Sequence, residues 1–165
     1  MSTQARATGE EQRSEGRSPP AAAGGSLAYL LKHAWLEFHE LTGAALAPYG
    51  IDGRELAVLT LLDREASLSQ QQAAGRLAID RTTMVAMVDG LEAKGLVERR
   101  THPGDRRKNL VDLTPAGRRT LRKARRAYDE VERRFLAPLG EAGARRLKDS
   151  LHTLITAAAG REPGR

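Results

Sequence analysis

The 165-residue chain contains no cysteine, and aromatic residues make up only 4% of it. Without cysteine it can form no disulfide framework, zinc-thiolate cluster, iron-sulfur centre, cysteine nucleophile or thiol redox switch. It must therefore be stabilised by burial of a hydrophobic core or by oligomerisation. A length close to about 150 residues favours a single globular domain.

Long apolar runs are also absent. No segment approaches the roughly 18 consecutive apolar residues that a membrane-spanning helix requires. The first residues lack the charged and then apolar pattern of a signal peptide. We therefore expect a cytoplasmic protein with no membrane partner.

Motifs for catalysis and metal binding are missing as well. His33 and His39 are six residues apart on one predicted helix, so they point roughly 120° away from each other and cannot share a metal ion. His102 and His152 have no neighbour at ligand spacing. The chain contains no H-E-x-x-H, G-x-x-x-x-G-K-[ST] or G-x-S-x-G sequence. We predict no enzymatic activity, no metal site and no cofactor.

The positive charge is concentrated in one stretch. The whole chain has a net charge of +6, yet residues 94–126 alone contain twelve basic and three acidic residues, a net charge of +9. Such a concentration is typical of a surface that binds a polyanion. The alternative is a basic helix that is merely solvated.

The N-terminal segment differs in composition from the rest. Residues 1–26 contain no Val, Ile, Leu, Phe, Trp or Tyr. Such a segment cannot bury enough apolar area to offset its ordering entropy, so we expect a disordered tail. The folded domain should cover residues 27–160.

Apolar spacing and capping residues predict four helices in the first part of this domain. Apolar positions recur every three or four residues over 27–46, and a D-x-x-E capping box at Asp52 starts a second helix over about 53–64. Ser69 and Gln72 start a short third helix that ends near Ala78. Asp80 caps a fourth helix from 81 to about 94. The last two helices, joined by a short turn, form a helix-turn-helix unit.

The segment after Gly95 is predicted to be a β-hairpin. Residues 96–101 and 108–113 have the pattern of two strands that flank a tip at 102–106. Thr114 and Pro115 then start a fifth helix, which runs to about 137, and a sixth helix covers about 141–159. The predicted fold is mainly α with a small β-hairpin. A winged helix-turn-helix lobe, residues 52–114, lies between long terminal helices at 27–47 and 115–160.

The fourth helix has the features of a helix that reads DNA. An α-helix fits the major groove of duplex DNA, and its N-terminal residues reach the base edges. Arg81 can contact a phosphate or a guanine, whereas a threonine offers a hydroxyl and a methyl group. Val85 and Ala86 could contact only a thymine methyl, or could instead pack inside the lobe. The predicted DNA-reading residues are Arg81, Thr82, Thr83, Val85 and Ala86.

The hairpin has the charge expected of a wing in the minor groove. A thin basic tip can lie in or beside this groove, where the negative potential favours an inserted arginine. Asp105 is two residues before Arg107 and could orient its guanidinium through a charge-assisted hydrogen bond. The basic residues around the tip are Arg99, Arg100, Arg106, Arg107 and Lys108.

The chain over residues 68–121 resembles the core of MarR-family (multiple-antibiotic-resistance regulator) transcription factors. The family's wing signature, D-x-R followed by L-T-x-x-G, is present as Asp105, Arg107, Leu113, Thr114 and Gly117, after the string GLVERR. The resemblance covers about residues 27–160. It implies a homodimeric bacterial repressor or activator that binds a pseudo-palindromic operator and, as is often the case in this family, is released by a small and frequently aromatic ligand; of the two signs of regulation, we expect a repressor. One departure is that Val85 and Ala86 occupy helix positions that are usually polar in this family.

The resemblance also suggests where such an effector would bind. A crevice is expected at the junction of the first helix, the second helix and the winged lobe of such a dimer. The side chains near it that could stack on or hydrogen-bond to an aromatic acid are His33, Trp35, His39 and Arg54. The alternative is that Trp35 belongs to the core and both histidines are ordinary surface residues. Oxidation of a thiol cannot be the signal, because cysteine is absent.

An alternative function, of a different class, is that the same basic surface binds RNA or an acidic protein without operator specificity. Recognition of single-stranded RNA usually needs aromatic residues that stack on bases near the basic surface. Residues 94–126 contain no Phe, Tyr or Trp. The sequence therefore favours double-stranded DNA as the partner.

Overall fold

The computed structural model describes residues 25–65, 67–102 and 105–159, and the side chains of residues 102, 105–108 and 159 lie outside this description. The chain divides into two units, Met1–Ala34 and Trp35–Arg165. In the first unit, the described residues are 25–34. There Ser26 starts a helix, because its hydroxyl accepts a hydrogen bond of 3.3 Å from the backbone N–H of Tyr29.

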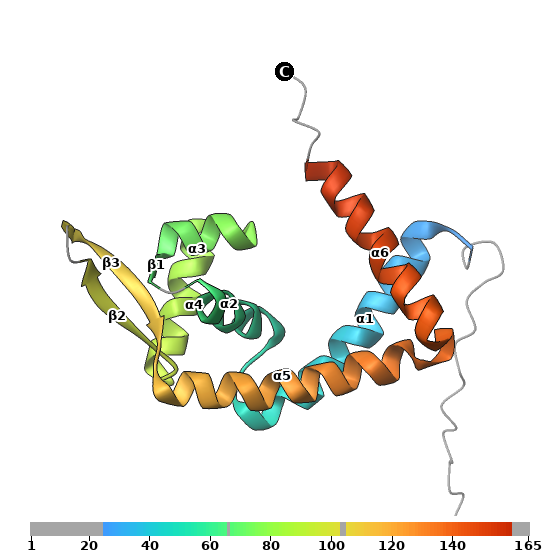
Figure 1. Cartoon of the computed structure of the whole chain (residues 1–165), viewed down its shortest axis with the longest axis horizontal. Coiled ribbons are helices and arrows are strands. Elements are labelled where there is room, and N and C mark those ends of the chain that lie inside the picture. The colour runs from blue at the N-terminus through green and yellow to red at the C-terminus, as the bar shows by residue number, and fades with distance from the viewer. Residues whose placement is uncertain (1–24, 66, 103–104, 160–165) are drawn as a thin grey trace, which may run out of the picture. The chain divides into compact units, whose positions relative to one another are not determined.

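The described residues form six α-helices, three strands and two short 3-10 helices, at Ala47–Tyr49 and Ala137–Leu139. The α-helices and strands are labelled in Figure 1. All six predicted helices are confirmed, and their ends lie within about a residue of the predicted ones. The fold is mainly α with a small antiparallel sheet, which is the predicted class. The helices are α1 (Leu27–Leu46), α2 (Gly53–Arg64), α3 (Gln70–Leu77), α4 (Arg81–Ala93), α5 (Pro115–Leu136) and α6 (Gly140–Ala159), and the strands are β1 (Leu68–Ser69), β2 (Val97–His102) and β3 (Asp105–Leu113).

Local capping explains why the helices begin where they do. At α2 the Asp52 carboxylate accepts a 2.8 Å hydrogen bond from the Glu55 N–H, and the Glu55 carboxylate accepts a 3.0 Å bond from the Asp52 N–H. Ser69 and Gln72 form the same reciprocal pair at α3. Thr114 caps α5, with Pro115 in its first turn. Each cap satisfies N–H groups that have no partner within the helix.

The sheet is larger than the predicted hairpin. Its strand order is β1-β3-β2, and both pairings are antiparallel. The register of β2 on β3 runs from Val97 opposite Leu113 to His102 opposite Asp105, so the strands continue into the segment 102–106 that we predicted to be a tip. The sequence missed this extension because a run of charged residues has no apolar alternation, whereas strand pairing satisfies the backbone whatever the side chains are.

The core lies where α2, α3, α4 and the sheet meet the first half of α5 (Figure 1). Leu59, Met84 and Leu91 are completely buried in it, and Leu121 of α5 joins the same cluster. The start of α5 is tied to the turn between α4 and β2, because the Thr114 hydroxyl donates a 2.7 Å hydrogen bond to the carbonyl oxygen of Gly95. Helix α4, which is the predicted DNA-reading helix and is called the recognition helix below, therefore forms one packed unit with α5 and with the wing of β2 and β3.

Helices α1 and α6 bury much less of their apolar surface. On α1, from residue 35 onward, and on α6, several large apolar side chains remain exposed: Trp35, Leu36, Leu41, Leu147, Leu154 and Ile155. Among the described residues, no helix combines the length and the apolar character that a membrane crossing requires.

Candidate nucleic-acid interface

The N-terminal turn of α4 is anchored from inside and open to solvent outside. Met84 and Leu91 are completely buried, which fixes the orientation of the helix. Arg81 and Thr82 are exposed. Ala86 is also exposed on this helix. The predicted DNA-reading residues therefore include three whose side chains are free to meet a ligand.

Thr83 and Val85 are placed differently from their predicted neighbours. The Thr83 hydroxyl donates a 2.6 Å hydrogen bond to Asp80 and the Thr83 N–H donates one of 2.9 Å. These bonds from Thr83 stabilise the carboxylate form of Asp80 and so hold its pKa below its usual value. Val85 is half-buried. Thr83 acts as part of the helix cap, and Val85 contributes partly to packing.

Arg99 of the wing has a structural role that the sequence did not predict. Its guanidinium donates hydrogen bonds to Asp89 and Glu92 of α4, and only 22% of its side chain is exposed. Burial lowers the pKa of Arg99, but the hydrogen bonds to the two carboxylates outweigh burial and raise it overall. Arg99 thus joins β2 to the recognition helix. The spacing of Asp89 and Glu92 on one helix face was the signal that could have indicated this pair.

Arg100 is the more accessible of the two arginines on β2. Its guanidinium pairs with Glu98 two residues earlier, and 64% of its side chain is exposed. The hydrogen bond to Glu98 raises the pKa of Arg100. A pair at the surface is worth little energy, so it leaves Arg100 available to another anion.

The tip of the wing is described only in its backbone. Asp105, Arg106, Arg107 and Lys108 form the first part of β3, and their side chains lie outside the described part of the structure. The proposed hydrogen bond from Arg107 to Asp105 stays a prediction.

Sequence reasoning missed the strand that supports the wing. Leu68 and Ser69 of β1 pair with Val111 and Leu110 of β3. Beside them, Asp112 accepts a 2.8 Å hydrogen bond from the Ser67 N–H. Two residues are too few to show strand periodicity, so no local signal could have revealed β1.

A second ion pair ties the far end of α4 to α2. The ammonium group of Lys94 donates to both carboxylate oxygens of Glu55, at 2.7 and 2.9 Å. The same carboxylate caps α2 through the Asp52 N–H. The C-terminal end of the recognition helix is therefore fixed to the N-terminus of α2, a link that sequence reasoning did not find.

The predicted effector residues are only partly brought together. The rings of Trp35 and His39 stack with centroids 4.9 Å apart and planes 10° apart. Trp35 is 59% exposed, so the expectation that it belongs to the core of the chain is wrong. Arg54 is exposed at the start of α2, and no hydrogen bond or ion pair is seen between it and any described residue. His33 lies in the first unit, where its ring is 4.1 Å from that of Tyr29.

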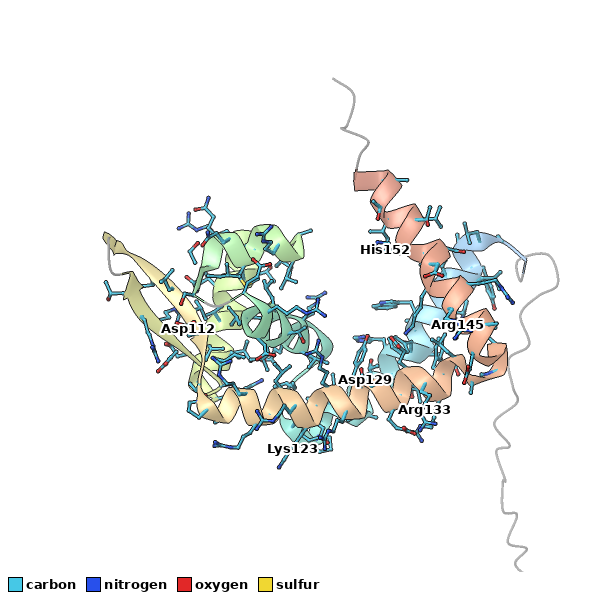
Figure 2. All side chains as sticks on the ribbon, viewed as in Figure 1. Asp112, Lys123, Asp129, Arg133, Arg145 and His152 are labelled. Carbon is cyan, nitrogen blue, oxygen red and sulfur yellow. The ribbon has the colours of Figure 1, made fainter. Side chains whose placement is uncertain are left out.

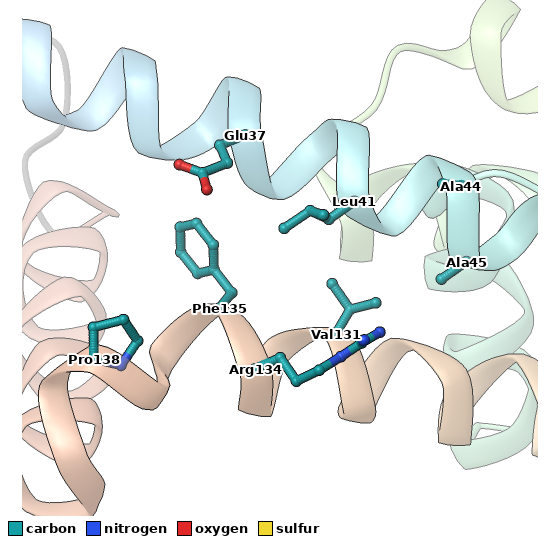
Figure 3. Close-up of a pocket in the computed structure, with 8 residues that line it drawn as sticks. All are labelled: Glu37, Leu41, Ala44, Ala45, Val131, Arg134, Phe135 and Pro138. Carbon is teal, nitrogen blue, oxygen red and sulfur yellow. The ribbon is translucent and has the colours of Figure 1, made fainter. Parts of the chain in front are cut away.

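A hollow of about 580 Å³ lies between α1 and α5 in the second unit (Figure 3). Leu41, Val131 and Phe135 form much of its wall, with Glu37 and Arg134 at its polar side. Phe135 also contacts Phe38, at a centroid distance of 5.1 Å. None of the four predicted effector residues lines this hollow. Among the described residues, no group of three or more His, Asp or Glu side chains could hold a metal ion.

Comparisons with known proteins agree with this architecture. A family model described as MarR family matches residues 49–108. The structure of the transcriptional repressor CouR bound to a 23-mer DNA duplex is 32% identical to the chain. It covers 87% of this chain and 99% of that chain, with a TM-score of 0.75. The chain belongs to the MarR family.

The chain is also similar to a ligand-bound structure and to a protein named as a regulator. CouR from Rhodococcus jostii RHA1, solved bound to p-coumaroyl-CoA, is 28% identical and covers 82% of this chain and 95% of that chain, with a TM-score of 0.71. A protein of Thauera aromatica, described as a transcriptional regulatory protein for the hcr operon, is 30% identical over 105 residues. That match covers 64% of this chain and spans 63% of the Thauera protein.

The MarR-family assignment confirms several predictions. The chain is a winged helix-turn-helix DNA-binding protein of a family of transcriptional regulators, which are not enzymes. The family recognised from the wing signature and the string GLVERR is the one that the comparisons find.

Proposed function

We propose that this chain is a homodimeric repressor of transcription that binds a pseudo-palindromic operator. The observation that carries the proposal is the solvent-exposed start of α4, where Arg81 and Thr82 extend from a helix whose opposite face is completely buried at Met84 and Leu91. A helix presented in this way can enter the major groove with its N-terminal residues at the base edges. The similarity to CouR, which was solved on duplex DNA, supports this role.

The homodimer is supported by apolar surface that has no cover within the described chain. Leu147, Leu154 and Ile155 of α6 are exposed, as is Leu41 of α1. Pairing about a two-fold axis would bury such side chains and would place two recognition helices about one turn of DNA apart, roughly 34 Å. In this proposal, residues 27–47 and 115–160 are the dimerisation helices, and residues 52–114 are the DNA-binding lobe.

The wing is the second element of the proposed DNA contact. The backbone of β3 begins at Asp105, so Arg106, Arg107 and Lys108 follow at the distal end of the hairpin. Arg107 is the residue proposed to enter the minor groove, with Asp105 as its orienting partner. Arg100, which is largely exposed, contributes to the binding of phosphates. Arg99 positions the wing against α4 and leaves the direct contacts to its neighbours.

Release by a small aromatic ligand is the regulatory part of the proposal. The exposed stack of Trp35 and His39 offers an aromatic platform at which such a ligand could bind. CouR was solved bound to p-coumaroyl-CoA, a ligand that carries an aromatic acyl group, and this supports the same class of effector here. A ligand can release DNA only if it binds the free dimer more tightly than the DNA-bound dimer.

Selection of bound sequences from random duplex DNA tests the proposed function most directly. The expected result is enrichment of an inverted repeat whose half-sites are about one helical turn apart. Repeating the selection with aromatic carboxylates and aromatic acyl-CoA thioesters shows whether a ligand releases the operator. Equal affinity for RNA, or no enrichment of any duplex sequence, would instead support a basic binding module without operator specificity.

A further inference from the structure

We propose that the outer face of α5 carries a binding site for the phosphate groups of a small phosphorylated ligand. Four basic residues form this site, which we call the α5 quartet: Arg119, Arg122, Lys123 and Arg126. Their spacing of three, four and seven residues places them within an arc of about 100° on the helix. All four are exposed. One part of this inference rests on the proposed function, namely that the ligand is the effector of the regulator.

The quartet faces away from the helix that packs on α5. Leu121 and Ala124 are buried on the side of α5 that meets α2, and Tyr128 packs against the same core. This side is about 180° around the helix from the quartet. Figure 2 shows Lys123 on the edge of α5 opposite α2. The quartet therefore takes no part in packing the core, and the charges of its four side chains are exposed to solvent.

The charges of the quartet are not neutralised by the described parts of the chain. No carboxylate among the described residues forms an ion pair with any of the four, although Arg118 of the same helix pairs with Asp63 at 3.4 Å. Glu130 is the acid that follows the quartet on the same side of α5, and it already pairs with Arg133 and Arg134. The hydrogen bond from Arg133 holds the pKa of Glu130 below its usual value.

This arrangement costs stability unless an anion is bound. Arg119 and Lys123 are four residues apart, as are Arg122 and Arg126, and like charges at this spacing repel each other across one helical turn. An anion with two or more phosphates can neutralise both pairs at once. Guanidinium groups also hold phosphate oxygens through two parallel hydrogen bonds.

The shape of the surface indicates what the ligand carries besides phosphate. The quartet lines a hollow of about 240 Å³. Arg119 and Lys123 also line a second hollow of about 330 Å³, together with Pro48, Tyr49 and Thr120. The second hollow offers an aromatic ring, a proline ring and a hydroxyl group. Phosphates in the first hollow and an organic group in the second fit a molecule of the nucleotide or coenzyme A class.

The position of this site gives the ligand a route to regulation. Pro48 and Tyr49 belong to the short 3-10 turn that connects α1 to α2, whereas Arg119 and Lys123 belong to the first half of α5. A ligand held by both would tie this connection to α5. Such a contact biases the regulator only if its geometry differs between the free and the DNA-bound state.

The test uses the full chain and two probes, coenzyme A and pyrophosphate, in isothermal titration calorimetry. The double variant Arg122→Ala/Lys123→Ala should bind both probes about tenfold more weakly, because two charge-assisted contacts are lost. The matched control Arg118→Ala removes one charge from the same helix but from the side that faces Asp63, and should bind within about twofold of the wild type. Both exposed alanines favour the helix, and thermal melting verifies folding.

Three outcomes would overturn the inference. The first is unchanged affinity of the double variant for both probes, and the second is an equal loss in Arg118→Ala. The third is that the double variant, without any ligand, binds the operator more weakly and has a smaller slope of log affinity against log salt concentration. That result would show that the quartet contacts DNA phosphates. Failure of the wild type to bind any duplex, with normal binding of coenzyme A, would refute the proposed function and leave the phosphate site standing.

Discussion

The guanidinium of Arg99 on β2 donates a hydrogen bond to the carboxylate of Asp89 on α4, so the wing and the recognition helix are joined by a side-chain contact. Glu92, one turn further along α4, accepts from the same guanidinium. One largely buried cation therefore fixes the angle between the two elements that the proposed function places in adjacent grooves. The residue acts on DNA by positioning these elements, and its own charge is already balanced.

This role predicts how Arg99→Ala affects DNA binding. Operator affinity should fall by about tenfold because the wing loses its fixed position, whereas the slope of log affinity against log salt should stay unchanged. Arg100→Ala is the matched comparison, because it removes an exposed charge and should reduce the slope by about 1. Fluorescence anisotropy over a range of salt concentrations measures both quantities. A reduced slope in Arg99→Ala would show a direct phosphate contact instead.

Gly117 is predicted to be the least replaceable residue at the start of α5. A Cβ atom at this position would lie 1.9 Å from the backbone carbonyl oxygen of Leu96. Because backbone must move to make room, Gly117→Ala should lower the free energy of unfolding by about 3 kcal/mol or more. In Gly90→Ala the added Cβ meets only Glu55 Oε1, at 3.9 Å, and helix propensity should raise stability by about 1 kcal/mol. Urea denaturation distinguishes the two, and similar effects of both would contradict the prediction.

The cap of the recognition helix should be sensitive to acid. The pKa of Asp80 is lowered in the folded chain from its ordinary value of 3.8, mainly by the hydrogen bond from the Thr83 hydroxyl. A lowered pKa adds stability that is fully present above the unfolded value and is lost as the pH falls through the folded value. As the pH is lowered from 7 to below 4, the melting temperature of the wild type should therefore fall further than that of Asp80→Asn, because asparagine caps the helix without titrating. Parallel losses in the two proteins would exclude this cap as a source of acid sensitivity.

The exposed apolar side chains of α6 should be required for dimerisation. Replacing Leu154 and Ile155 together by glutamate places two charges on a surface that the proposed dimer buries, so the protein should become monomeric. Arg145→Glu changes an exposed residue of the same helix, labelled in Figure 2, and should remain dimeric. Light scattering at micromolar concentration gives the mass of each variant. A wild-type protein that is a stable monomer under these conditions would refute the homodimer.

Arg107 is predicted to be the most important wing residue for affinity. Arg107→Ala should weaken operator binding strongly, and Asp105→Ala should weaken it by a smaller amount because the guanidinium loses its orientation. The wild-type dimer should have a salt slope of about −5 or steeper if it contacts six or more phosphates. Footprinting with minor-groove probes shows whether the contact at the outer flank of each half-site disappears in Arg107→Ala. Unchanged affinity and slope in this variant would remove the wing tip from the interface.

Helix boundaries could be predicted because the interactions that set them are local. The capping pairs Asp52–Glu55 and Ser69–Gln72, and the caps at Asp80 and Thr114, all act within three residues along the chain. A spacing that is visible in the sequence is therefore also the spacing of the physical contact. The same holds for the family signature in the wing, whose residues lie in one short stretch from Asp105 to Gly117 and indicated the correct family.

Contacts between distant segments were decided only by the tertiary structure. The pairing of β1 with β3 joins Leu68 to Val111, and the clamp of Lys94 on Glu55 joins residues 39 positions apart. Whether an arginine is paired or open also depends on such contacts: Arg99 meets two acids of α4, whereas Arg122 of the α5 quartet meets none among the described residues. The sequence by itself determined the helices, the charge of the basic stretch and the family. Only the folded chain separated the cations that hold the lobe together from those left for a ligand, because charge is a property of a residue whereas neutralisation is a property of its neighbours in space.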